Sequence, residues 1–128
     1  MQRVKFTMEF MFRSSPAILY QFLTTPSCLI RWFCDGVDIQ GNIYVFVWEG
    51  STQSAEILDD IEEELIRFRW LDAEDGAEFL EFKITTAPVT DDTILEITDF
   101  SDEDELDDQK MLWEAQMEHL RKEMGAGG

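Results

Sequence analysis

Basic residues are scarce in this chain of 128 residues, which has 10 Lys and Arg against 28 Asp and Glu and a formal net charge of -18. Nucleic-acid binding depends on Lys and Arg that neutralise phosphates. A surface this acidic also repels an anionic membrane. The composition therefore argues against nucleic acid and membrane surfaces as partners, and it favours a protein kept soluble by its charge.

Cysteine and histidine are almost absent. Cys28 and Cys34 lie too close together in one short apolar segment to form a stabilising disulfide bond, so we expect two free thiols. His119 is the single histidine and has Glu118 and Arg121 nearby, so a solvent-facing position is expected and a histidine-based metal site is excluded. The sequence predicts no cofactor, no metal and no catalytic residue.

Long hydrophobic runs are absent as well, and no window approaches the length of a membrane-spanning helix. The first twelve residues, MQRVKFTMEFMF, alternate between apolar and polar side chains. This alternation is typical of a half-buried strand and not of a signal peptide. We therefore expect a cytoplasmic protein.

The chain is rich in strand-forming and aromatic residues, with 4 Trp, 10 Phe and 2 Tyr. Segments rich in Ile, Val, Phe, Trp and Thr follow one another from residue 37 to residue 100. Gly-Asn, Glu-Gly, Asp-Asp and Asp-Gly pairs separate them, which indicates a meander of hairpins. Together with the first strand, this predicts antiparallel strands at 4–12, 37–40, 43–49, 52–59, 63–71, 78–87 and 92–100.

Helix signals lie on both sides of the meander. Ser-Ser-Pro at 14–16 predicts a helix start with a Ser cap and Pro in the first turn. Thr-Pro-Ser at 25–27 ends that helix and begins a second short one. A long helix is expected over 105–124, and its acidic run at 101–108 lacks the Gly of a calcium loop. Its apolar stripe is formed by Leu106, Trp113, Met117, Leu120 and Met124.

These elements predict an α+β helix-grip fold, in which a seven-stranded curved antiparallel sheet wraps around the C-terminal helix and two short helices follow the first strand. The sheet has one apolar face, and only the terminal helix is long enough to cover it. Residues 1–124 are expected to form one domain, with 125–128 as a flexible tail. A cavity beneath the long helix is expected, because short helices cannot seal both ends of a curved sheet.

This order of elements, with SSPAILYQFLTTPSCLIRW at 14–32, resembles the START-like or Bet v 1-like (SRPBCC) superfamily. The most similar branch is the family named for the C-terminal domain of the Hsp90 co-chaperone activator. Its aromatic-rich strand with a Gly turn resembles the segment from Phe46 to Gly50, and its last helix resembles the segment around Trp113. Thr25 and Leu112 depart from the family pattern, which usually has an acidic residue and often a Gly there.

The resemblance implies three functions. The first is binding of a small hydrophobic molecule between the sheet and the terminal helix. The alternatives are a protein-interaction module, like the Hsp90 co-chaperone domain, and an aromatase/cyclase-like enzyme, which ranks third because no acid–base pair is visible. The oligomeric state stays open. The residues predicted to contact a ligand are Tyr20, Trp32, Phe46, Trp48, Phe68, Trp70, Phe82, Trp113, Gln116, Met117 and Leu120.

Two of these residues are polar side chains among apolar neighbours. Tyr20 lies beside Leu19 in the first helix, and Gln116 lies beside Met117 in the last. A buried phenol or amide needs a hydrogen-bond partner. Either a ligand or the protein itself can supply it, and the sequence leaves both open.

Overall fold

The structure is a computed structural model, and it describes residues 2–73 and 76–125. The expected α+β architecture is confirmed, with two short helices after the first strand and one long helix at the end of the chain. In chain order the elements are β1 (Arg3–Phe12), α1 (Pro16–Thr24), α2 (Pro26–Trp32), β2 (Gly36–Gln40), β3 (Ile43–Trp48), β4 (Ser51–Ile61), β5 (Leu65–Trp70), β6 (Leu80–Thr86), β7 (Thr93–Asp102), the short 3-10 helix η1 (Glu103–Glu105) and α3 (Leu106–Met124).

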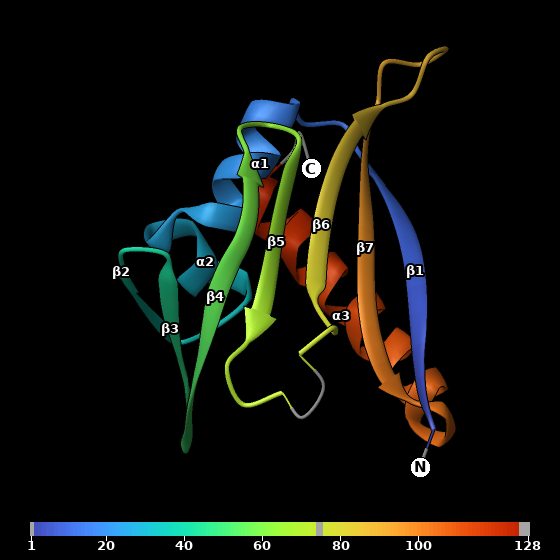
Figure 1. Ribbon diagram of the computed structural model, residues 1–128. Helices are drawn as coiled ribbons and strands as arrows, with labels where there is room; N and C mark the ends of the chain where they lie inside the picture. Colours follow the sequence, from blue (N-terminus) through green and yellow to red (C-terminus); the bar gives the residue numbers. More distant parts are fainter. Residues whose placement is uncertain (1, 74–75, 126–128) are drawn as a thin grey trace.

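The seven strands form one antiparallel sheet in the order β1-β7-β6-β5-β4-β3-β2. Consecutive strands from β2 to β7 are neighbours, and β1 pairs with β7, so β1 and β2 are the two edges. The three α-helices lie on one side of the curved sheet, with α3 running behind it (Figure 1). No helix within the described residues combines the length and the apolar character that crossing a membrane requires.

Local signals account for the helix starts and the tight turns. The Ser15 hydroxyl oxygen accepts a hydrogen bond from the backbone N–H of Ile18, and Pro16 occupies the first turn of α1, as the sequence predicts. The turns that flank β3 contain Gly41 and Gly50, with φ of 63° and 80°. Glycine adopts this left-handed conformation without the steric cost that a Cβ brings.

The last strand and the long helix meet differently from the prediction. Strand β7 continues to Asp102, two residues past the expected end, because its pairing with β1 extends to the Arg3–Asp102 pair. The turn η1 follows, and α3 begins at Leu106. The acidic residues that open α3 lie where the helix dipole favours negative charge, as expected.

The concave face of the sheet forms the core together with the helices. Its aromatic rings form a continuous cluster in which Phe46 contacts five other rings, those of Phe33, Tyr44, Trp48, Phe68 and Trp70. Two indole N–H groups anchor the helical segment to this core. Trp32 donates to the Phe22 carbonyl and Trp48 donates to the Phe33 carbonyl, both at 2.8 Å.

The opposite face of the sheet is charged. Arg67 in β5 pairs with Glu81 in β6 at 2.5 Å, and Arg69 pairs with Glu56 in β4 at the same distance. The sequence predicts the charged face from the alternation in β5 and β6. Cross-strand ion pairs of this kind support pairing modestly, by about 0.2–1 kcal/mol each.

Candidate functional site

A cavity of about 770 Å³ lies at one end of the sheet. It exists because β5 and β6 stop pairing at Phe68 and Leu80, while β5 continues to Trp70. The described residues between these strands, 71–73 and 76–79, lie outside the sheet (Figure 1). The end of β7, η1 and the first turns of α3 contribute the remaining wall. The cavity is open to solvent on one side.

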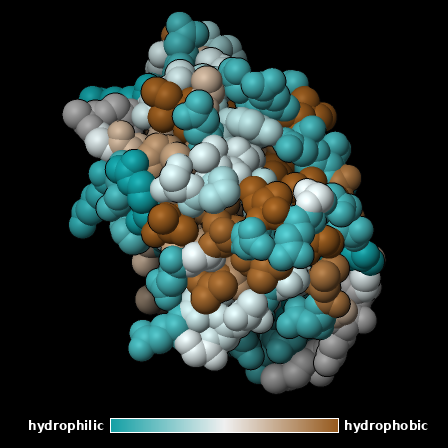
Figure 2. Space-filling view, turned by 90° about the vertical axis from the view of Figure 1, so that its left-hand side faces the viewer, coloured by the Kyte–Doolittle hydropathy of each residue, from teal (hydrophilic) through white to brown (hydrophobic). Residues whose placement is uncertain are grey.

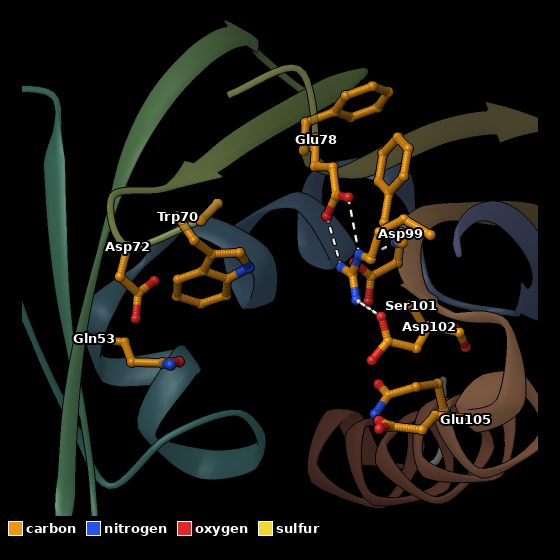
Figure 3. Close-up of a pocket in the computed structure, with 13 residues that line it drawn as sticks. Gln53, Trp70, Asp72, Glu78, Asp99, Ser101, Asp102 and Glu105 are labelled. Carbon is orange, nitrogen blue, oxygen red and sulfur yellow. Dashed lines mark hydrogen bonds and ion pairs between the residues drawn. The ribbon is translucent and has the colours of Figure 1, made fainter. Parts of the chain in front are cut away.

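The lining combines aromatic rings with carboxylates. Trp70 contributes an aromatic ring, whereas the rings of Phe79 and Phe100 contact each other edge to face at 5.3 Å, and the Phe79 ring is covered by Arg67 at 4.5 Å and Lys5 at 5.7 Å. Figure 3 shows Trp70 facing the acidic side chains across the cavity. The other lining residues are Arg3, Gln53, Asp72, Ala73, Glu78, Asp99, Ser101, Asp102, Glu105 and Gln109.

Arg3 holds one wall of the cavity together. Its Nε and Nη2 donate to the two carboxylate oxygens of Glu78 at 2.9 and 2.6 Å, and its Nη1 donates to Asp102 Oδ1 at 3.2 Å (Figure 3). The bonds to Glu78 raise the pKa of the Arg3 guanidinium, so it stays charged. A bidentate pair of this kind fixes geometry as well as charge, and here it joins the start of β1 to the segment before β6.

Asp99 is a half-buried carboxyl group of the cavity wall. It lies near the end of β7, where the backbone N–H of Phe100 donates to Oδ1 at 2.8 Å and the indole N–H of Trp113 donates to Oδ2 at 3.0 Å. Burial raises the pKa of Asp99, and this effect exceeds the lowering by the two hydrogen bonds and by Arg3. The site therefore contains a carboxyl group that is poorly hydrated and fixed in orientation by α3.

The raised pKa of Asp99 predicts a pH-dependent contribution to stability. The carboxyl group of Asp99 stays protonated to a higher pH in the folded state than in the unfolded chain, where its pKa is near 3.8. The free energy that the neutral group contributes to folding is therefore lost as the pH rises through the folded-state pKa. Because Asp99→Asn cannot ionise, its free energy of unfolding relative to the wild type should increase as the pH rises above about 4.

Urea unfolding at several pH values measures this difference. Asp104→Asn, which removes an exposed carboxyl group outside the cavity lining, is the control for the loss of one carboxylate. A pH-independent difference for Asp99→Asn would mean that this carboxyl group is as well hydrated as in the unfolded chain.

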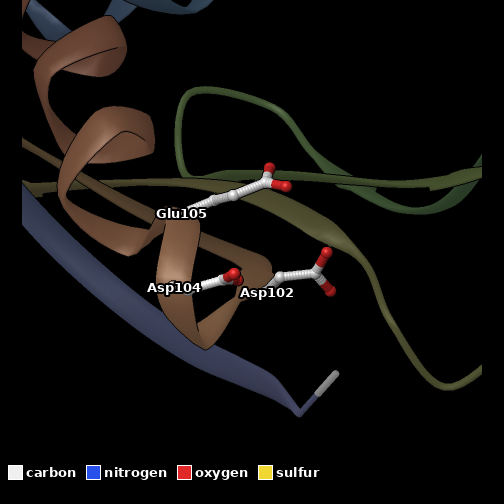
Figure 4. A group of neighbouring side chains, drawn as sticks. All are labelled: Asp102, Asp104 and Glu105. Carbon is white, nitrogen blue, oxygen red and sulfur yellow. The ribbon is translucent and has the colours of Figure 1, made fainter.

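A group of three carboxylates lies where β7 passes into η1. Oxygen atoms of Asp102, Asp104 and Glu105 all lie within 4.8 Å of one another (Figure 4). Asp102 and Glu105 also line the cavity, so this group adds to the negative potential at its mouth. Asp104 and Glu105 are exposed, and Asp102 is half-buried and paired with Arg3.

Among the eleven residues predicted to contact a ligand, Trp70 lines the cavity. Phe46, Phe68 and Trp48 belong to the ring cluster that continues from Trp70 into the core. The remaining residues lie elsewhere on the helices and the concave face. The expectation that these ten contact a ligand stays a prediction.

The predicted residues beneath α3 are closely packed. Trp113 contacts Phe82 edge to face at 5.8 Å, and Phe82 contacts Trp32 in the same way at 6.4 Å. Met117 and Leu120 are buried farther along the helix. Trp113 reaches the cavity indirectly, since its indole N–H holds Asp99. The structure thus brings Trp32, Phe82 and Trp113 together, but outside the cavity lining.

The two polar candidates differ in their surroundings. The Tyr20 hydroxyl group donates to Asp60 in β4, so a protein group supplies the partner that the phenol requires. Burial, followed by the effect of Asp60, raises the Tyr20 pKa. Gln116 is half-buried on α3 and lies outside the cavity lining. The phenol therefore does not need a ligand to satisfy its hydrogen bonding.

The scarce residue types behave as the sequence predicts. Cys28 and Cys34 are both free thiols. Burial raises the pKa of Cys34 to about 11, and Asp35 adds to this, so the thiol is inert at neutral pH. His119 is exposed on α3, 3.8 Å from Glu123. Neither Cys34 nor His119 lines the cavity.

Most of the cavity residues escape prediction from the sequence. Arg3 and Glu78 lie 75 positions apart, and a sequence pattern cannot reveal that they pair. Asp99 interrupts the apolar alternation of β7 after Leu95 and Ile97, and that interruption is a signal that could have identified it. A carboxylate on an apolar strand face is a reason to look for a site.

Comparison with known proteins decides the family. A family model described as a START-like superfamily domain matches residues 1–126. The chain belongs to the START-like superfamily. No curated protein matches it. The resemblance seen in the sequence is therefore confirmed at the level of the superfamily.

Solved structures agree with this START-like assignment. The chain is similar to BfR322 from Bacteroides fragilis, with 36% identity, a TM-score of 0.70 and coverage of 95% of this chain and 91% of that chain. The Aha1 dimer from Colwellia psychrerythraea has a TM-score of 0.82 at 17% identity, with coverage of 97% and 98%. CalU16 from Micromonospora echinospora has a TM-score of 0.74 at 18% identity, with coverage of 95% and 76%. The last two show the fold alone.

Proposed function

We propose that this START-like domain is a binding protein that holds a small molecule with a hydrophobic part in the cavity between the sheet and the start of α3. The observation that carries the proposal is the cavity itself. Its volume of about 770 Å³ lies within the range of about 300–1,000 Å³ that small-molecule sites occupy. Its lining is more polar than that of most small-molecule sites, and Trp70 supplies an aromatic surface within it.

The arrangement around Trp70 supports a ligand with an aromatic or other flat apolar part. Three of the four Trp residues donate their indole N–H to a protein acceptor, namely Trp32, Trp48 and Trp113. Among the described residues, none accepts from the indole N–H of Trp70. This half-buried ring therefore offers the cavity both an apolar face and a free donor.

A neutral fluorescent probe, N-phenylnaphthylamine, tests the proposal. We expect saturable binding with increased fluorescence, and Trp70→Ala should weaken it about tenfold, as the loss of one aromatic contact worth roughly 1.4 kcal/mol predicts. Gln53→Trp should weaken it too, because it fills the cavity without removing core packing. Leu71→Ala is the matched control, since Leu71 is 51% exposed, adjoins Trp70 and lies outside the lining. Binding that both cavity variants leave unchanged would contradict the proposal.

A protein-interaction role is the second candidate, and the opposite edge of the sheet favours it. Strand β2 is an edge strand with a free row of backbone groups, which is a template for pairing with another chain. Hydrophobic side chains are exposed at Ile30 in α2, Ile39 in β2 and Val47 in β3. Figure 2 faces this side of the molecule and shows hydrophobic residues gathered near its middle. A partner bound there would leave the cavity free.

A further inference from the structure

The charge of the cavity is strongly unbalanced. Five carboxylates line it and Arg3 is the single basic residue in the lining. Arg3 is already engaged by Glu78 and Asp102. Among the described residues, no cationic side chain forms an ion pair with the other three carboxylates, those of Asp72, Asp99 and Glu105. The cavity therefore has a surplus of negative charge that the protein itself does not balance.

The carboxylates lie on both sides of the cavity. In Figure 3, Gln53, Trp70 and Asp72 lie on one side, and Glu78, Asp99, Asp102 and Glu105 lie on the other. A molecule that enters between them meets an indole ring and carboxylates together. An indole face attracts cations through its quadrupole, and a nearby carboxylate attracts them through its charge. Both kinds of lining group therefore favour the same ligand chemistry.

Other ligand classes fit this cavity less well. An anion, such as a fatty acid, would meet repulsion from the lining and from a chain with a net charge of -18. A purely apolar ligand would displace water from the carboxylates without supplying a positive charge, and this desolvation costs free energy. A bare metal ion would make no apolar contact with the ring of Trp70. An organic cation satisfies both the rings and the carboxylates.

We propose that the cavity binds an organic amine in its cationic form, with the ammonium group on the side of Asp99 and Glu105 and the apolar part against Trp70. This rests on the proposed function, since it names the ligand class of the same site. Charge-assisted hydrogen bonds to the ammonium group would strengthen in a partly enclosed site. The acidic surface of the whole chain would also raise the local concentration of cations around the mouth of the cavity.

Three probes of one shape and different charge test the ligand class: naphthylethylamine, naphthylethanol and naphthylacetic acid. Binding is followed by amide and indole NMR shifts of the full chain at near-neutral pH. We expect the amine to bind about tenfold more tightly than the alcohol, which corresponds to about one charge-assisted contact. The acid should bind more weakly than the alcohol.

Two variants, each of which removes one negative charge, distinguish an effect of the cavity lining from an effect of the acidic surface as a whole. Glu105→Gln should reduce the preference for the amine over the alcohol several-fold, because Glu105 lines the cavity. Asp104→Asn should reduce this preference less than Glu105→Gln does, because Asp104 belongs to the same carboxylate group but lies outside the lining. Both residues are on the surface, so both variants should fold.

The outcomes are distinct. A preference for the amine that Glu105→Gln weakens more than Asp104→Asn does would support the proposal. Equal binding of the amine and the alcohol, tighter binding of the acid, or equal effects of the two variants would overturn the ligand class and leave the cavity as a small-molecule site. Binding of none of the three probes would overturn both the ligand class and the proposed function. Loss of the amine on adding calcium chloride at equal ionic strength would overturn the proposal in favour of a metal site.

Discussion

Trp113→Ala is expected to lower the free energy of unfolding by about 3–5 kcal/mol. The ring is 5% exposed, packs edge to face against Phe82 and donates its N–H to Asp99. The substitution removes this packing and leaves the buried Asp99 carboxyl group without one of its two donors. Such a loss is a large fraction of the stability of a domain this size.

Urea unfolding of three variants dissects this effect. Trp113→Phe keeps a ring but removes the donor to Asp99, so it should cost less than the alanine variant and still more than 1 kcal/mol, about the value of an unsatisfied buried group. Leu112→Ala is the neighbouring control, because Leu112 is 50% exposed, and its effect should stay within about 0.5 kcal/mol. A loss below about 1 kcal/mol for Trp113→Ala would mean that the ring has an open side and forms part of a cavity ceiling.

Phe46→Ala is expected to have a similarly large effect, also about 3–5 kcal/mol. Phe46 is 1% exposed and contacts five other aromatic rings, so its removal opens a void at the centre of the ring cluster. The adjacent Val47→Ala is the matched control. Val47 is 42% exposed on the opposite face of β3, and its loss should change stability by less than about 0.5 kcal/mol.

Thermal and urea unfolding, followed by tryptophan fluorescence, measure this difference. Trp48 and Trp70 both contact Phe46, so the emission of the folded Phe46→Ala variant should also change. A small effect of Phe46→Ala with an equal effect of Val47→Ala would mean that the cluster is loosely packed. The aromatic segment from Arg31 to Gly50 would then be cavity wall and not core.

The fold follows from the sequence because its signals are local. Alternation in β1 and β5, the Ser-Pro start of α1 and the apolar stripe of α3 each report on neighbours a few residues apart. Turn residues such as Gly41 fix where one strand ends and the next begins. The family resemblance then supplied the order in which these elements pack.

The cavity does not follow from the sequence, because it depends on where strand pairing stops. The pattern predicts β5 and β6 but not that their pairing ends at Phe68 and Leu80. That separation opens the space and turns Trp70 from a core residue into a lining residue. The expected cavity wall beneath the middle of α3 is instead packed by Trp113 and Phe82, because large aromatic rings from both layers meet there.

NMR mapping of bound N-phenylnaphthylamine tests the central claim most directly, because it shows where on the molecule a small ligand lies. If the cavity at the end of β5 is the site, the largest shift changes will occur at the indole N–H of Trp70 and at the amides of Ala73, Ser101 and Gln109, which line it on three sides. Changes confined to the β2 edge around Ile39, or no changes at all, would contradict the account and favour the protein-interaction role.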